Sequence, residues 1–219
     1  MNNDIIINKT VSFVKDTLKN AESGHDWWHI NRVWTNARHI AAAEDCNLLV
    51  VELAALLHDI ADSKFHNGDE EIGPQTAGNF LKTIDADAQT IEHVQQIIRY
   101  MSFKASFNKS GFHSPELAIV QDADRLDAIG AIGIARAFAY GGHKNREIYN
   151  PEIEPNLNMS KEEYKSSTAP TINHFYEKLL LLKDKMNTAE GKRLAMERHE
   201  FMEQFLKQFY SEISLPSLF

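Results

Sequence analysis

The sequence predicts an all-α fold, and three observations support this class. Apolar residues recur at helical spacing along the whole chain, as at Ile7, Val11, Val14 and Leu18. Residues typical of helix starts and helix ends separate these stretches. No segment alternates between apolar and polar residues as a half-buried strand does. The 219 residues, 43% of them hydrophobic, suit one domain over residues 1–219.

The first part of the chain contains a series of expected helices with clear breaks between them. Their expected ranges are 7–18, 30–40, 48–58, 77–81 and 88–101. Ser23-Gly24 separates the first two, and Gly73-Pro74 precedes the short fourth one. The stretch from Leu48 to His58 is almost continuously apolar, so this helix is expected to be buried.

The second part of the chain begins with a strong helix start at Ser114-Pro115-Glu116, where a hydroxyl precedes a proline and an acid. This helix is expected to run through Asp124 towards Tyr140 and to end at Gly141-Gly142. Residues 143–159 carry no period and predict a long ordered loop or lid. Ser160 and Glu163 form a capping box that opens another helix. Helical stretches at about 170–186 and 189–212 complete the chain.

The composition excludes several classes of function and favours a cytoplasmic protein. Lys and Arg number 23 against 31 Asp and Glu, which gives a net charge of −8. Nucleic-acid polymers and membrane surfaces are polyanionic, so neither is an expected partner. A single cysteine, Cys46, excludes an intrachain disulfide and fits a reducing compartment. No secretory signal or membrane-spanning run is evident.

Three clusters combine metal-ligand residue types with an apolar helical setting. The first spans His25, Asp26 and His29 at a helix start, where the spacing allows one shared face. The second is the doublet His58-Asp59 at the end of the apolar helix, where burial is costly without a partner. The third contains the carboxylates of residues 122, 124 and 127. Alone, each cluster is commonly a cap, a solvated turn or a hydrogen-bonded core group. Together, imidazoles and carboxylates suit a divalent ion.

These residues resemble the H…HD…D signature of the HD superfamily of metal-dependent phosphohydrolases. The signature residues are His29, the doublet His58-Asp59 and the distant Asp124. Their flanks, and the segments 174–179 and 188–198, are similar to the small bacterial HD-domain hydrolases. The resemblance covers nearly the whole chain.

The resemblance implies a helical bundle around a single metal site, with C-terminal helices of about 160–212 packed on a metal core of about 20–140. It also implies hydrolysis of a phosphomonoester, phosphodiester or phosphoanhydride by a metal-activated water, often in a nucleotide. The implied ligands of one divalent ion (Mn, Mg, Ni, Co or Fe) are His29, His58, Asp59 and Asp124. Asp124 is preferred over Asp122 because the family's ligand precedes a basic residue and a leucine.

Further residues near the motifs are candidates for catalysis or substrate binding. The catalytic candidates are Asp59, Asp62, Lys64 and Asp127, and the candidates for substrate binding are His25, Asp26, Lys64, Arg125 and Lys178. For Asp26 and Asp62 the alternative is a helix cap or a solvated loop. For the cations it is an ordinary surface ion pair. A polyphosphate substrate requires cations beyond the metal, and Arg136, Lys144 and Arg146 are further candidates. His39, His66, His113 and His199 are expected at the surface or in loops.

Other functions remain open beside the phosphohydrolase. One is a non-catalytic sensor that binds a metal and a nucleotide. Another is an HD-type oxygenase with two irons, for which His93 and His113 lie in suitable parts of the chain. A purely structural bundle leaves the doublet His58-Asp59 unexplained. The expected partner is a small phosphorylated substrate, with a nucleotide favoured, and the oligomeric state is open.

Overall fold

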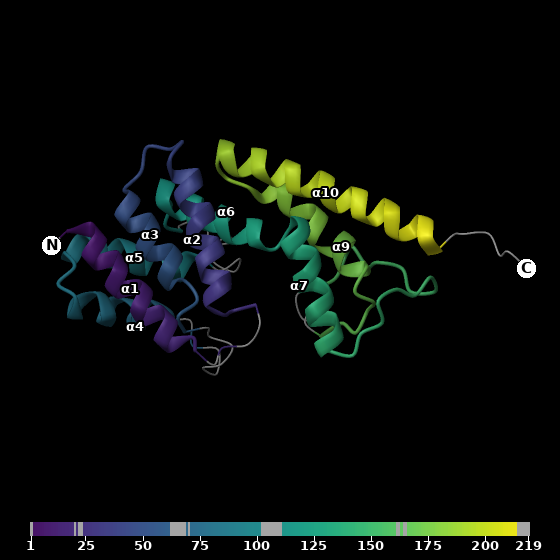
Figure 1. The fold of residues 1–219 in the computed structure, drawn as a ribbon, viewed down its shortest axis with the longest axis horizontal. Helices are drawn as coiled ribbons and strands as arrows, with labels where there is room; N and C mark the ends of the chain where they lie inside the picture. Colours follow the sequence, from purple (N-terminus) through teal and green to yellow (C-terminus); the bar gives the residue numbers. More distant parts are fainter. Residues whose placement is uncertain are drawn as a thin grey trace, which may run out of the picture. The chain divides into compact units, whose positions relative to one another are not determined.

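The computed structural model describes residues 2–19, 21, 24–61, 69, 71–101, 111–160, 163 and 166–213. Every regular element within those ranges is a helix, which confirms the all-α class (Figure 1). The chain forms two compact units, Met1–Asp124 (unit 1) and Arg125–Phe219 (unit 2). The single domain expected over residues 1–219 is not tested by this division and stays a prediction.

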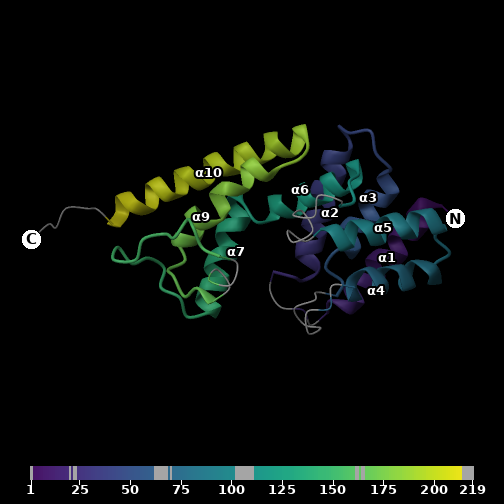
Figure 2. The same cartoon turned by 180° about the vertical axis from the view of Figure 1, so that it is seen from behind.

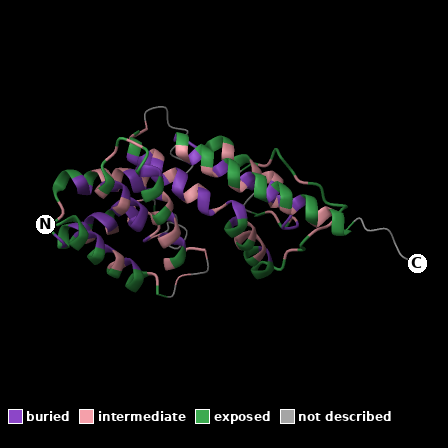
Figure 3. Cartoon of the chain, turned by 45° about the horizontal axis from the view of Figure 1, so that its top comes forward, coloured by how far each residue is buried: buried purple, intermediate pink, exposed green. Residues whose placement is uncertain are grey.

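Unit 1 is built from the helices that carry the first and second motifs. These are α1 (Asn3–Thr17), α2 (Trp27–Ala41), α3 (Leu48–Leu57), α4 (Ile72–Thr83), α5 (Ala88–Tyr100) and most of α6 (Pro115–Asp127). Helix α3 packs against α1, α2 and α5, and α4 lies along α5 (Figure 2). In this unit, buried residues line the faces that the helices turn towards one another (Figure 3).

Helix α3 is the apolar centre of unit 1. Seven of its ten residues are buried, so it is enclosed on almost every side, as its sequence predicts. Its N-terminus is fixed by Asn47, whose side chain accepts a hydrogen bond from the Val50 N–H and whose own N–H donates to Glu116. Because α3 ends at Leu57, His58 and Asp59 follow directly from the core.

Helix α4 is longer than the sequence predicts. The expected short helix at 77–81 begins at Ile72 instead, and Gly73 and Pro74 lie buried in its first turn. Proline is tolerated there, because the N–H groups of a first turn have no intrahelical acceptor. The Gly73-Pro74 pair therefore belongs to the start of the helix and does not separate it from the chain before it.

The continuous helix expected from Ser114 to Tyr140 is wrong, because the chain turns after Asp127. Ile129 is extended, with φ −127° and ψ 170°, and Gly130 has a positive φ of 72°. A new helix, α7 (Gly130–His143), starts there and belongs to unit 2. A Cβ on Gly130 would lie 3.0 Å from Cβ of Arg198, so both the backbone and the packing favour glycine at this corner.

Further helices of unit 2 in the described ranges are α9 (Asn173–Glu177), the 3₁₀ helix η3 (Leu179–Lys185) and α10 (Ala189–Ile213). The single helical stretch expected at 170–186 is thus two short helices, since Lys178 departs from helical geometry with φ −146°. Helix α10 packs against α7 and η3. The rings of Phe138, Phe175 and Phe205 pack together between α7, α9 and α10.

The predicted irregular segment 143–159 is anchored to the helices of unit 2. Tyr149 packs its ring against Phe209 and Tyr210 of α10. Asn173 donates a side-chain hydrogen bond of 2.9 Å to the Ile153 carbonyl. The predicted capping box is confirmed, because Ser160 and Glu163 exchange backbone-to-side-chain hydrogen bonds. Its helix falls partly on residues 161–162 and 164–165, outside the described residues.

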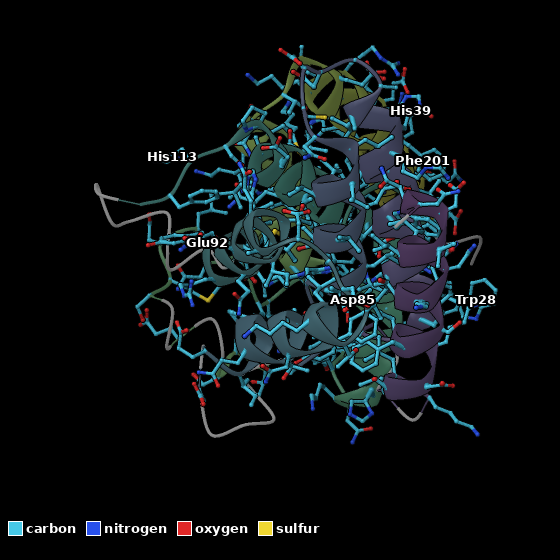
Figure 4. The ribbon with its side chains drawn as sticks, turned by 90° about the vertical axis from the view of Figure 1, so that its left-hand side faces the viewer. Trp28, His39, Asp85, Glu92, His113 and Phe201 are labelled. Carbon is cyan, nitrogen blue, oxygen red and sulfur yellow. The ribbon has the colours of Figure 1, made fainter. Side chains whose placement is uncertain are left out.

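The position expected for His199, at the surface or in a loop, is wrong. His199 is buried at 5% exposure, not at the surface, and its Nε2 lies 3.1 Å from Glu203 one turn further on. His39 and His113 are exposed as expected (Figure 4), and His66 lies outside the described residues. None of the helices in the described ranges has the length and apolar character needed to cross a membrane.

Candidate metal centre

Asp26 fixes the start of helix α2 and thereby the position of His29. Its carboxylate accepts a hydrogen bond of 2.9 Å from the His29 N–H, and its backbone is extended, as at a helix N-cap. His29 falls in the first turn, and its side chain is 2% exposed. The structure therefore gives Asp26 a capping contact, and its expected role in substrate binding stays a prediction.

His58 follows α3 in an orientation that determines which of its ring nitrogens carries the proton. Its Nδ1 lies 2.9 Å from the Ala55 carbonyl oxygen, which can only accept, so Nδ1 carries the proton. In a neutral imidazole Nε2 is then the unprotonated nitrogen. That atom is buried and has no hydrogen-bond partner among the residues that the structure describes. A buried lone pair without a donor is costly, and a metal ion is a partner that this tautomer fits.

The other predicted ligands lie around the same point. One nitrogen from each of His29 and His58 and one carboxylate oxygen of Asp59 lie within 4.8 Å of one another. Nε2 of His29 is 3.8 Å from Oδ2 of Asp59 and 3.6 Å from Oδ1 of Asp124. Nε2 of His58 is 3.9 Å from the same Asp124 oxygen. Two imidazoles and two carboxylates thus converge within unit 1.

His25 contacts this cluster through a carboxylate. Its Nδ1 lies 2.5 Å from Oδ2 of Asp59, within hydrogen-bond distance. Burial by itself raises the pKa of Asp59, but the hydrogen bond with His25 and the neighbouring imidazoles outweigh it and hold that pKa below its ordinary value. The carboxylate is therefore ionised at neutral pH, the state that a metal ligand requires.

The structure favours Asp124 over Asp122 as the carboxylate from α6. Asp122 is fully buried, whereas Asp124 is 42% exposed at its side chain and faces the two histidines. Two contacts hold α6 within unit 1: Asn36 donates to the Ala123 carbonyl, and Gln121 donates to the Tyr100 carbonyl. These bonds come from α2 and α5, so neighbouring helices fix the position of Asp124.

For the other predicted site residues, the contacts that the structure shows are with groups outside this cluster. Asp127 is buried and forms an ion pair with Arg136, which also donates to the Asp127 carbonyl. Arg125 donates to the carbonyl of Lys185 within unit 2. Lys178 is exposed at the end of α9. Asp62 and Lys64 lie outside the described residues. The roles expected for all five stay predictions.

The alternative of a site with two metals requires a second group of ligands, and the described residues contain none around His93 or His113. Nε2 of His93 lies 3.1 Å from the Ser114 hydroxyl and 3.4 Å from Glu116, and His113 is exposed. Within the described ranges, the group of three potential ligands that meets one point is His29, His58 and Asp59. The tautomer of His58 was not predicted from the sequence. The signal that could have indicated it is the position of Ala55, three residues before His58, at the end of an expected helix.

Several known proteins are similar to this chain in sequence and in fold. Residues 27–129 match the HD domain family. YpgQ of Bacillus subtilis (strain 168) is 38% identical over 206 residues, which cover 92% of this chain and 91% of YpgQ. The crystal structure of an HD-superfamily hydrolase from Bacillus thuringiensis matches with a TM-score of 0.79 and 43% identity, covering 98% of this chain and 100% of the other. The crystal structure of YpgQ in complex with ADP matches with a TM-score of 0.78 and 35% identity over 100% and 99% of the two chains.

The chain therefore belongs to the HD superfamily of hydrolases. The predicted family is confirmed, and HD-domain proteins are a class in which a divalent metal is expected. The converging side chains of His29, His58 and Asp59 agree with that expectation.

Proposed function

We propose that this protein is a divalent-metal-dependent phosphohydrolase that acts on a nucleotide. The observation that carries the proposal is the buried Nε2 of His58 beside His29 and Asp59. This nitrogen is unprotonated and has no hydrogen-bond partner within the described part of the chain. A structural histidine in a protein core normally has its polar atoms satisfied. An atom of this kind next to an ionised carboxylate favours a metal-binding role over a packing role.

The residues of this chain have separable tasks in the proposed reaction. His29, His58, Asp59 and Asp124 would hold the ion, and a bound divalent ion would lower the pKa of a coordinated water and screen the charge of the phosphoryl group. The Ala55 carbonyl keeps the proton of His58 on Nδ1, away from the site. His25 orients the Asp59 carboxylate, and the Asp26 cap keeps His29 in the first turn of α2.

Two observations support a nucleotide as the substrate. The similar protein YpgQ has been crystallised in complex with ADP. The proposed ligand set holds two carboxylates, which neutralise one divalent ion. A polyphosphate then needs further cations, and the sequence offers candidates for them among its 23 Lys and Arg residues. Cleavage of an anhydride and cleavage of a phosphate ester both remain consistent with these features.

A substrate and metal screen tests the proposal. The full chain is freed of metal with a chelator and resupplied separately with Mn, Mg, Ni, Co or Fe. It is then given nucleoside mono-, di- and triphosphates and small phosphomonoesters, and release of phosphate or pyrophosphate is measured. We expect turnover of a nucleotide only with metal. Binding of metal and nucleotide without turnover would indicate a sensor, and a preference for small monoesters would reject the nucleotide.

A further inference from the structure

Two cations share one aromatic ring at the end of α7. Nζ of Lys144 lies 5.6 Å from the ring centroid of Tyr140, and Cζ of Arg146 lies 5.4 Å from the same centroid. Both distances are within the range of a cation–π interaction. The ring is 54% exposed, so a solute can reach it. Two positive charges held on one ring repel each other, and an anion between them would relieve that repulsion.

Lys144 and Arg146 have no ion pair with a carboxylate of the residues that the structure describes. The guanidinium of Arg146 donates to the neutral carbonyl of Ser167. The carboxylates of Glu147 and Glu177 accept hydrogen bonds from the Asn150 side chain and the Asn156 N–H instead. Among the described residues, neither cation is thus paired with a carboxylate.

The backbone brings α9 next to these cations. The Thr171 N–H donates to the Glu147 carbonyl at 2.8 Å, and the Ile172 N–H donates to the Ile148 carbonyl at 3.1 Å. Gly141 permits this approach, because a Cβ there would lie 2.1 Å from the Thr171 hydroxyl. The segment after Arg146 is therefore paired with the segment that leads into α9.

His174 of α9 is influenced by Arg146 and by a further cation, Lys178. Burial, and then the charges of Lys178 and Arg146, lower the pKa of His174 to about 4. Arg146 comes from the segment after α7, whereas Lys178 lies one turn after His174. The two cations thus act on one neutral imidazole from different parts of unit 2.

We propose that Lys144, Arg146, His174 and Lys178 form a phosphate-binding site in unit 2. A guanidinium and two ammonium groups supply charge-assisted hydrogen bonds to phosphate oxygens, and a neutral imidazole supplies a further donor. The assignment rests on the proposed function for its ligand, the phosphate chain of a nucleotide. Arg125 and Arg136 are also expected as candidate cations from the sequence, and they contact the Lys185 carbonyl and Asp127.

Binding to metal-free protein separates this site from the metal centre. The full chain is treated with a chelator and titrated by calorimetry with ADP, pyrophosphate, inorganic phosphate and adenosine. We expect ADP and pyrophosphate to bind without metal and adenosine not to bind. If phosphate binds as tightly as ADP, the site recognises a free phosphate group and the nucleotide assignment fails. Absence of any anion binding would overturn the site itself.

Variants that each remove one positive charge test which residues bind ADP. Arg146→Gln and Lys178→Gln should each weaken ADP binding to the metal-free protein about tenfold, the loss of one charge-assisted hydrogen bond. Lys207→Gln removes an exposed charge from α10 and should bind like the parent chain. Circular dichroism checks that each variant is folded, and titration with Mn²⁺ should give unchanged metal affinity. Equal ADP affinity in all four proteins overturns the inference, while the metal-dependent hydrolysis proposed above would still stand or fall by its own screen.

Discussion

The candidate metal centre of unit 1 and the proposed phosphate-binding site of unit 2 are built in opposite ways. In unit 1, His29 and His58 stand on or directly after regular helices, are almost fully buried, and have backbone or side-chain contacts that fix their orientation. In unit 2, Lys144, Arg146 and Lys178 lie at helix ends or in irregular segments, and two of them contact an exposed ring. A buried site must be preorganised, because misplaced polar groups are costly there, whereas exposed cations can adjust to a ligand.

The largest expected effect is at the centre of unit 1. Asp59→Ala should abolish measurable metal binding and lower metal-dependent turnover by roughly a thousandfold or more, because it removes an ionised ligand. Asp16→Ala removes an exposed carboxylate from α1 and is the matched control. Metal titration, a hydrolysis assay and circular dichroism measure the three properties. An unfolded Asp59→Ala protein would mean that the cluster is structural, which would remove the contrast between the two regions.

The next effect concerns the pH dependence of stability in unit 2. The pKa of His174 is about 4 in the folded chain against 6.5 ordinarily, so the unfolded chain takes up the proton first as the pH falls. The stability linked to this histidine is complete above pH 6.5 and is lost as the pH falls to about 4. The loss is at most about 3 kcal/mol. Urea unfolding of the parent chain and of His174→Asn should show a shallower decline for the variant over that range. Equal declines would show that the folded chain does not hold His174 neutral over this pH range.

A smaller effect tests the corner between α6 and α7. Gly130→Ala should lower the free energy of unfolding by about 1–3 kcal/mol, because φ is positive there and the new Cβ meets Arg198. Gly142→Ala is the control, since its Cβ would meet nothing within 4 Å. That variant should be neutral or slightly more stable, as alanine favours a helix. Chemical denaturation compares the two, and equal stabilities would contradict the strained corner.

The smallest effect separates a cap from a substrate contact at Asp26. Asp26→Asn keeps a side-chain acceptor for the His29 N–H, whereas Asp26→Ala loses it and should cost about 1 kcal/mol. If the role is capping alone, Asp26→Asn should retain the parent chain's KM and kcat. A clear rise in KM for Asp26→Asn, with unchanged thermal stability, would instead support the predicted contact with substrate.

The sequence predicted best where local signals and tertiary packing agree. The apolar run before His58 marks both α3 and its burial, and Ser114-Pro115 marks the start of α6. It failed where packing overrides a continuing helical pattern. Between Asp127 and Gly130 the apolar period does not stop, and the turn is accompanied by the ion pair of Asp127 with Arg136 and by Arg198 packed on Gly130. Such long-range contacts have no signature in a local window.

In the candidate site, too, the sequence indicated the motif residues but not the long-range contacts between them. The four expected ligands follow from the resemblance of the motifs to the HD signature. The structure brings them together, and their role as ligands stays a proposal. The contact of His25 with Asp59 joins residues 34 positions apart, so spacing within one helix could not reveal it. The burial of His199 likewise depends on which face of α10 is covered by its neighbours, and a mixed polar sequence does not decide that.

The acceptor that sets the tautomer of His58 belongs to the main chain. The last four carbonyls of a helix have no partner within it, and Ala55 provides one of these four in α3. Substituting the side chain at position 55 would therefore leave the acceptor in place. Any drift in sequence that keeps α3 ending at Leu57 keeps the lone pair of Nε2 directed into the site. The residues of α3 can thus be substituted within the limits of packing, whereas a change in where the helix ends would move this acceptor.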